Sequence, residues 1–216
     1  MINLFCGYDP REAVGFHVFV HSVLKHASVP VNIIALDNRG LPQGSNCFTL
    51  SRFLVPYLMG FSGHAIFADA SDMLCQSDIA ELDSLFDSKY AVQVVKHADY
   101  TTRHPVKYIG TELECKNRDY TRKNWASLML INCEHRNWRD MTPDLISRSM
   151  PLSLLQLNWA QVGELPPWWN VLADEGHDTD NAAILHWTAG IPAFTHYHDA
   201  PCADAWHDSL AEMMAV

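Results

Sequence analysis

The residues best placed to do chemistry are two aspartates that follow a short apolar run. In the segment AIFADASDMLCQSDIAEL, Asp69 comes directly after the apolar residues and Asp72 follows three positions later. Two carboxylates this close at the end of a strand can share one hard divalent cation, leaving other coordination positions for water and phosphate oxygens. The alternative is that both are turn or N-cap residues whose side chains only satisfy backbone donors.

A histidine far along the chain favours the metal interpretation. His186 lies at the end of an apolar run in ILHWTAGIP. A lone histidine in such a place is more often a structural residue than a ligand, so its significance depends on its meeting the two aspartates. An imidazole ligand would favour Mn²⁺ over Mg²⁺, because imidazole suits transition metals better than the hardest cations.

The elements that would position these side chains alternate between strands and helices in the first half of the chain. Apolar runs predict strands at residues 2–6, 31–36, 64–68 and 90–95. Helical patterns lie between them, at residues 11–27, 50–60 and 79–86. This order is typical of a largely parallel sheet, and ligands gather at the carboxyl edge of such a sheet. Asp69 would lie at that edge.

The second half of the chain is less regular. Residues 99–124 form a polar stretch too long for an ordinary connection, which indicates a functional loop. Beyond it we expect a buried strand at residues 125–132 and a short helix within residues 135–149. A last strand at residues 182–187 and a closing helix at residues 204–214 follow. No linker or repeat divides the chain, so we predict a single domain.

The composition narrows the possible partners and the compartment. The chain has 216 residues with a formal net charge of −10, and its Lys and Arg residues are scattered, so we expect no nucleic acid partner. The six cysteines form no CxxC pair, which argues against structural zinc and favours a reducing compartment. With no leader-like start and no run of about 18 apolar residues, we expect a cytoplasmic protein without a transmembrane segment.

Six segments together resemble the retaining glycosyltransferases of family 8, the glycogenin and galactosyltransferase-like group. In order, they are FCGYDPREAVGFHVFVHSVL, LSRFLVPYL, IFADASDMLCQSDIAEL, WASLMLIN, LPPWWN and ILHWTAGIP. The resemblance implies a GT-A type nucleotide-diphospho-sugar transferase fold, an α/β fold with a mostly parallel sheet flanked by helices. It also implies transfer of a sugar from a UDP-sugar to an unknown acceptor, with residues 1–98 binding the nucleotide and residues 99–216 holding the sugar and acceptor.

The resemblance assigns the metal site to the residues singled out above. Asp69 and Asp72 match the family's Asp-x-Asp motif with one extra residue between them, and His186 matches its third ligand. The wider spacing leaves open whether both carboxylates reach the cation directly or one acts through water. The bound Mn²⁺, or Mg²⁺, would stabilise the negative charge that grows on the diphosphate leaving group.

Nucleotide and sugar contacts are implied in the same way. The first βα turn holds the nucleoside in this family, so Tyr8 and Asp9 would contact the base and ribose. Arg52 matches a position near the phosphate and base. Where the family has Asn-x-Gly, this chain has WAS, so Asn124 or Ser127 would recognise the donor sugar.

Two departures from the family concern the reacting groups. The family's Asp-Gln pair near the sugar carbon corresponds here to Leu155 and Gln156, which leaves Gln156 as a donor-sugar contact and removes a carboxylate. The lysine that often grips the diphosphate is absent after the C-terminal histidine, and Lys123 or Arg122 is expected to substitute.

Two other functions fit part of the pattern. A transferase fold that kept the cation and nucleotide site but lost turnover would be a non-catalytic nucleotide-sugar binder, which the substitution at Leu155 favours. A Mg²⁺-dependent phosphatase would use an aspartate as its nucleophile. Such enzymes carry that aspartate after the first strand with a second one two residues later, whereas here the motif follows the third predicted strand.

Overall fold

A six-stranded sheet forms the centre of the molecule, whose computed structural model describes residues 1–42 and 44–215. The strand order is β2-β1-β3-β8-β5-β9. Neighbouring strands are parallel apart from the two pairs that β8 makes, which confirms the expected mostly parallel sheet. The strands are β1 (Ile2–Gly7), β2 (Val31–Leu36), β3 (His64–Ala68), β5 (Val92–Val94), β8 (Leu128–Asn132) and β9 (Val162–Glu164).

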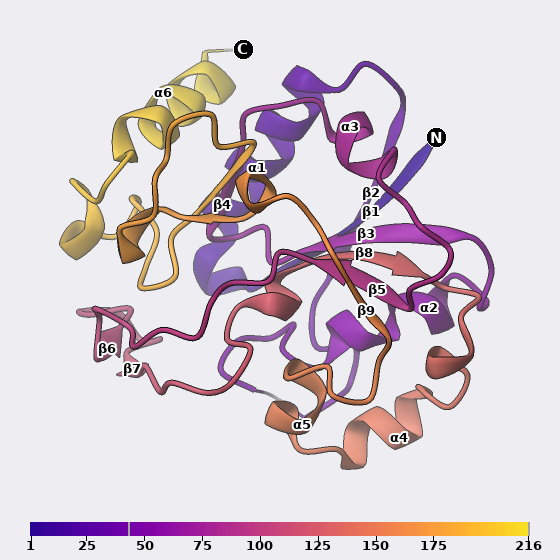
Figure 1. The fold of residues 1–216 in the computed structure, drawn as a ribbon. Helices are drawn as coiled ribbons and strands as arrows, with labels where there is room; N and C mark the ends of the chain where they lie inside the picture. Colours follow the sequence, from indigo (N-terminus) through magenta and orange to yellow (C-terminus); the bar gives the residue numbers. More distant parts are fainter. Residues whose placement is uncertain (43, 216) are drawn as a thin grey trace.

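Helices cover both faces of this sheet because successive side chains of its strands point to opposite sides. Leu4 packs in one core with Phe19 of α1, and its neighbour Phe5 packs in the other core with Phe53. Figure 1 shows α1, α3 and α6 on one side and α2, α4 and α5 on the other. The helices are α1 (Ala13–His26), α2 (Val55–Leu58), α3 (Ile79–Asp83), α4 (Pro143–Arg148), α5 (Pro151–Leu155) and α6 (Ala203–Met214).

A second, three-stranded sheet carries one candidate ligand, His186, and one of its strands begins directly after another, Asp72. Its order is β10 (Val171–Leu172), β11 (Ile184–His186) and β4 (Met73–Cys75). A third core, which includes Val18, Leu74, Leu185 and Trp206, joins this sheet to α1 and α6. The sequence pattern predicted β11 within residues 182–187 but not β4 or β10.

Two segments that line the site differ from the sequence prediction. Residues 50–60 form a 3-10 helix, Ser51–Leu54, that continues into the short α2, because Pro56 has no N–H and is tolerated only in the first turn. The predicted strand at 125–132 begins only at Leu128, and Trp125–Ser127 is a 3-10 turn.

The long polar stretch at residues 99–124 is an excursion with a small hairpin, β6 (Val106–Lys107) paired with β7 (Cys115–Lys116). Figure 1 shows this hairpin at the left of the view, away from the central sheet. Residues of the excursion nevertheless lie within reach of the carboxyl edge of β3.

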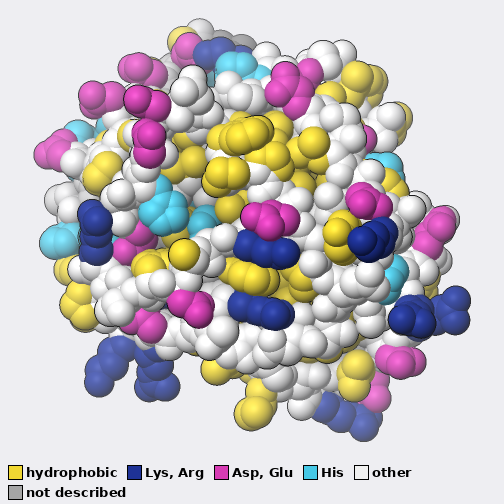
Figure 2. Space-filling model, in the orientation of Figure 1, with side chains coloured by type: hydrophobic (Ala, Val, Ile, Leu, Met, Phe, Trp, Pro, Cys, Tyr) yellow, Lys and Arg dark blue, Asp and Glu magenta, His cyan; other side chains and the backbone are white. Residues whose placement is uncertain are grey.

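The surface carries both signs of charge. On the face drawn in Figure 2, basic and acidic side chains are interspersed and the basic ones do not merge into one patch. This distribution agrees with the scattered Lys and Arg of the sequence. Among the described residues, none of the helices has the length and apolar character that a membrane crossing needs.

Candidate functional site

A tight reversal of the chain brings the two aspartates together after β3. The Ser71 amide donates to the Asp69 carbonyl at 2.7 Å, and the Met73 amide donates to the Ala70 carbonyl at 3.1 Å. Ala70 has a φ of 62°, in the left-handed region, which lets the chain turn back within two residues. The extra residue that separates Asp69 from Asp72 is therefore absorbed in the turn.

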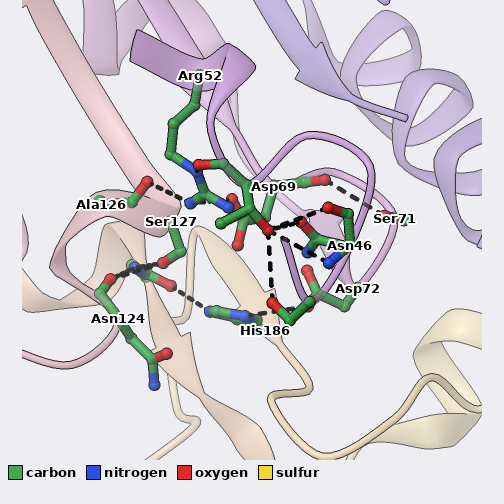
Figure 3. A network of polar contacts seen from close by, with 12 residues as sticks. Asn46, Arg52, Asp69, Ser71, Asp72, Asn124, Ala126, Ser127 and His186 are labelled. Atoms are coloured by element: carbon green, nitrogen blue, oxygen red, sulfur yellow. Dashed lines mark hydrogen bonds and ion pairs between the residues drawn. The ribbon is translucent and has the colours of Figure 1, made fainter. Parts of the chain in front are cut away.

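Strand pairing brings His186 to the same place. In the antiparallel pair β4–β11, His186 lies opposite Met73, and the Trp187 amide donates to the Asp72 carbonyl at 2.9 Å. One ligand atom from each of Asp69, Asp72 and His186 lies within 4.8 Å of the others, and all three side chains are buried. Figure 3 shows the three residues gathered around one point.

A buried arginine lies against the first aspartate. Arg52 Nη1 is 2.6 Å from Asp69 Oδ1 and donates to the Ala126 carbonyl at 2.8 Å. The Arg52 guanidinium carbon also lies 5.4 and 5.1 Å from the ring centroids of Phe48 and Phe67. These contacts fix the guanidinium beside the site, as Figure 3 shows.

Burial and neighbouring charges shift the proton equilibria of the cluster. The pKa of Asp69 is raised to about 7, mainly because the carboxyl group is buried. The Arg52 guanidinium opposes this shift, and the Asp72 carboxylate adds to it. Burial alone would lower the pKa of His186, but the carboxylates of Asp72 and Asp69 outweigh that effect and raise the pKa. The cluster thus concentrates negative charge that a cation would relieve.

The donor set fits a divalent cation. Asp72 Oδ1 is buried and has no hydrogen-bond partner among residues 1–42 and 44–215. His186 Nε2 lies 3.4 Å from Asp72 Oδ2, on the side of the aspartates. An orphaned buried carboxylate oxygen costs free energy unless a ligand satisfies it, and two carboxylates with one imidazole suit Mn²⁺ or a similar transition metal.

The cluster lies in a polar pocket between the loop after β2, the β3 end and the 99–124 excursion. Asn124 and Ser127, two residues expected to recognise a sugar, line it, and so does Leu155. The other lining residues are Ser45, Asn46, Thr49, Arg52, Asp69, Asp72, Lys107, Tyr108, Tyr120, Ala126, His186 and Thr188.

Tyr8 and Asp9 do not line this pocket. The Tyr8 ring packs edge-on against Phe16, with centroids 5.1 Å apart. The fully buried Asp9 carboxylate accepts hydrogen bonds from Arg11 Nε at 2.8 Å and from the Cys47 amide at 3.0 Å. Asp9 thus ties the first βα turn to the loop after β2, and a contact of either residue with a nucleoside stays a prediction.

The three other residues singled out in the second half also lie outside the pocket lining. Gln156 uses its carbonyl to accept from Arg122 Nη1 at 3.2 Å, and the Arg122 guanidinium lies over the Trp125 ring. Lys123 is buried, and its Nζ donates to Asn117 Oδ1 at 2.8 Å. The lysine that does line the pocket is Lys107, on β6.

Sequence reasoning missed Lys107 and also Asn170, whose Oδ1 lies 2.9 Å from His186 Nδ1. Lys107 lies in an irregular stretch with several cations, and no periodicity indicates which of them points inward. Asn170 belongs to the LPPWWN segment that entered the resemblance, and a buried amide after two tryptophans was the available signal.

Solved structures with the same fold are glycosyltransferases. The bifunctional glycosyltransferase WbbM aligns with a TM-score of 0.67 and 14% identity over 99% of this chain and 51% of its own, so the chain spans about half of it. The galactosyltransferase LgtC, in complex with donor and acceptor sugar analogs, aligns with a TM-score of 0.63 and 13% identity, over 100% of this chain and 97% of its own. The glycosyltransferase GlyE of Streptococcus pneumoniae aligns with a TM-score of 0.65 and 11% identity, over 99% of this chain and 62% of its own. The fold is therefore the GT-A fold.

One curated protein gives a closer match in sequence. Protein CDI of Arabidopsis thaliana is 35% identical over 231 residues, which cover 97% of this chain and 86% of the plant protein. No protein-family model matches the chain. At this identity and coverage, the chain belongs to the family of Protein CDI, with the architecture of the GT-A glycosyltransferases.

Proposed function

We propose that the chain is a metal-dependent glycosyltransferase that moves a sugar from a UDP-sugar to an acceptor with retention, in the manner of family 8. The observation that carries the proposal is the cluster of Asp69, Asp72 and His186 at the carboxyl edge of a GT-A sheet. Arg52 and Lys107 line the same pocket, so cations surround the place where a diphosphate would meet the ion.

Each charged residue of the pocket has a distinct role in this proposal. A divalent cation, Mn²⁺ in this proposal, held by Asp69, Asp72 and His186 would supply Lewis-acid stabilisation of the departing diphosphate. Lys107 places a positive charge at the pocket, where it would bind phosphate oxygens. Arg52 balances the charge of Asp69 and keeps its carboxylate in place.

Retention would follow from a front-face route in which a diphosphate oxygen takes the proton of the acceptor hydroxyl. That route needs no carboxylate nucleophile on the enzyme. It is therefore compatible with Leu155, which lines the pocket where the resembling family has an aspartate.

Binding a nucleotide sugar requires the pocket to open. Its volume of about 80 Å³ is well below the roughly 300–1,000 Å³ of typical small-molecule sites. Lys107, Tyr108 and Tyr120 of the excursion line one side, and Ser45 of the loop after β2 lines another. Outward movement of one of these loops is the structural change that the proposal demands, as in other enzymes with closing loops.

The first test is thermal stability with nucleotide and metal. A ligand that binds only the folded state raises stability by about 2.7 kcal/mol at a concentration 100 times its dissociation constant. We expect UDP and Mn²⁺ together to raise the melting temperature more than either does alone. A panel of nucleotide sugars should then yield slow release of the nucleoside diphosphate. No shift with any nucleotide would contradict the proposal.

Two aspartate variants sharpen this test. Asp72→Ala should remove the Mn²⁺-dependent part of the shift while circular dichroism shows an intact fold. Asp78→Ala is the matched control, because Asp78 caps α3 just after β4 and lies outside the pocket lining. An unchanged Mn²⁺ dependence in Asp72→Ala would remove Asp72 from the site.

A second candidate is a non-catalytic binder of nucleotide sugars. Leu155 at the pocket wall favours it, because an apolar side chain there offers nothing to a sugar hydroxyl. The binder would show the same thermal shift but release no nucleoside diphosphate. A phosphatase using Asp69 as nucleophile is disfavoured, since that carboxylate is ion-paired with Arg52 at 2.6 Å.

A further inference from the structure

A chain of hydrogen bonds runs from the back of His186 to the backbone of the sugar-side turn. His186 Nδ1 lies 2.9 Å from Oδ1 of Asn170, which is fully buried. Asn170 Nδ2 donates to Ser127 Oγ at 2.9 Å, and Ser127 Oγ donates to the Asn124 carbonyl at 2.7 Å. Figure 3 shows Asn124, Ser127 and His186 along this line.

The last link fixes the direction of every other link. The Asn124 carbonyl can only accept, and it lies 2.7 Å from Ser127 Oγ and 3.5 Å from Asn170 Nδ2, so the Ser127 hydroxyl hydrogen and the NH₂ group of Asn170 both face it. Ser127 Oγ must then accept from Asn170, which requires the NH₂ group of Asn170 on that side. The Asn170 oxygen consequently faces His186, where it can only accept a proton from Nδ1.

We propose that Asn170 is a positioning residue that holds His186 with its proton on Nδ1 and the lone pair of Nε2 directed at the cation. The inference rests on the proposed metal-dependent function for its use, but not for the tautomer itself. It also assigns Ser127 a structural role, because its hydroxyl hydrogen is used within the chain and is not free for a sugar.

The need for Asn170 comes from a competitor on the other side of the ring. Asp72 Oδ2 lies 3.4 Å from His186 Nε2 and would accept a proton there. A proton on Nε2 would occupy the atom that must bind the cation. The closer contact of Asn170 at Nδ1 opposes this tautomer, as partners of metal-binding histidines generally do.

The experiment measures Mn²⁺ affinity and the His186 tautomer in the same set of variants. Asn170→Leu removes all three hydrogen bonds of the amide, to His186, Ser127 and the Asn124 carbonyl, and Ser127→Ala removes only the hydroxyl that orients it. Asn132→Leu is the matched control, because this buried asparagine donates to the Ser88 carbonyl and lies outside the pocket lining. Calorimetry gives the affinity, and long-range proton–nitrogen NMR of the metal-free protein with neutral imidazole gives the tautomer.

We expect Asn170→Leu to bind Mn²⁺ about 10 to 100 times more weakly than the wild type and to move the proton to Nε2. Ser127→Ala should weaken binding less, by under about tenfold, and it keeps the test available if Asn170→Leu does not fold. Asn132→Leu should match the wild type in both measurements.

The outcomes separate this inference from the proposed function. Equal Mn²⁺ affinity in the wild type, Asn170→Leu and Ser127→Ala would overturn the positioning role, and so would a proton on Nε2 in the wild type. A different outcome would be a proton on Nδ1 in the wild type and on Nε2 in Asn170→Leu, with no Mn²⁺ binding by the wild type. The proposed function would then fail, while the role of Asn170 in setting the tautomer would stand.

Discussion

At the scale of single residues, the two cations of the pocket differ in what they already bind. Arg52 is held by Asp69 and the Ala126 carbonyl. Lys107 has no ion-pair partner among the described residues, and its Nζ lies 4.8 Å from the Tyr108 ring centroid. Lys107 is therefore the cation that can meet an incoming anion.

This difference predicts a selective effect of one substitution. Lys107→Ala should weaken UDP binding in the presence of Mn²⁺ by about 10- to 100-fold, since a hydrogen bond to a charged group contributes about 1.5–3 kcal/mol. Mn²⁺ binding alone should not weaken, because Lys107 is a positive charge that acts on Asp69 and its loss does not disfavour a cation. Calorimetry measures both. Lys116→Ala is the control, because this exposed lysine of the same hairpin lies outside the pocket lining. Equal losses in both variants would point to general electrostatics instead.

The proposed metal ligands could be predicted from the sequence, whereas Lys107 could not, because of where each residue lies along the chain. Asp69 and Asp72 are close in sequence and follow a clear strand, and His186 ends another predicted strand, so the sequence could single out all three as candidates. Their meeting depends on the pairing of β4 with β11. Lys107 is one of several cations in an irregular excursion. Its inward position depends on how the hairpin docks, and local pattern does not encode that.

At the scale of elements, the turn between β3 and β4 decides the geometry of the site. Ala70 is fully buried and left-handed, and the turn returns Asp72 to Asp69. Beside it, α1 packs so closely that a Cβ placed on Gly15 would lie 1.9 Å from the Ser71 carbonyl oxygen. Helix α1 thus packs directly against the turn that carries the two aspartates.

The turn predicts opposite outcomes for two substitutions of Ala70. Glycine adopts a positive φ freely, so Ala70→Gly should keep both stability and Mn²⁺ affinity. Ala70→Val should cost about 1–3 kcal/mol of unfolding free energy through overpacking and strain, and it should weaken Mn²⁺ binding. Urea denaturation and calorimetry measure these effects. Ala35→Val, on an exposed position of β2, is the control and should change neither. A neutral Ala70→Val would contradict the account of this turn.

Element length accounts for most of the gap between predicted and observed elements. Strands β1, β2 and β3 have five or six residues, and the sequence predicts all three nearly in full. Strands β4 and β10 have three and two residues, too few for an alternating pattern to show. Their pairing with β11 is a tertiary effect, and it is also what places His186 beside Asp72.

At the scale of the whole molecule, acid stability depends on a buried carboxylate that joins separate segments. Asp9 in the first βα turn accepts from Arg11 and from the amide of Cys47 in the loop after β2. Burial alone would raise the pKa of Asp9, but these hydrogen bonds outweigh it and lower the pKa to about 2. The ionised form therefore stabilises the folded state.

The lowered pKa sets the pH range of the effect. The contribution is fully present above the unfolded-state pKa of about 3.9 and is lost as the pH falls through the folded-state pKa. Asp9→Asn should cost about 1–3 kcal/mol at neutral pH. The difference from the wild type should shrink below about pH 4. Urea denaturation from neutral to acidic pH measures it, and a difference independent of pH would contradict the assignment.

The position of β8 has a consequence for how the chain is made. β8 pairs with β3 and β5, although its first residue lies sixty positions after Ala68, and β5 otherwise pairs only with β9 among the described strands. During synthesis, β3 therefore keeps a bare edge until residue 132 emerges, and bare edges pair readily with other chains. Long-range pairing of this kind also slows folding. Residues 1–98 and 99–216 are thus expected to fold as one cooperative unit, and a polypeptide cut between them should aggregate.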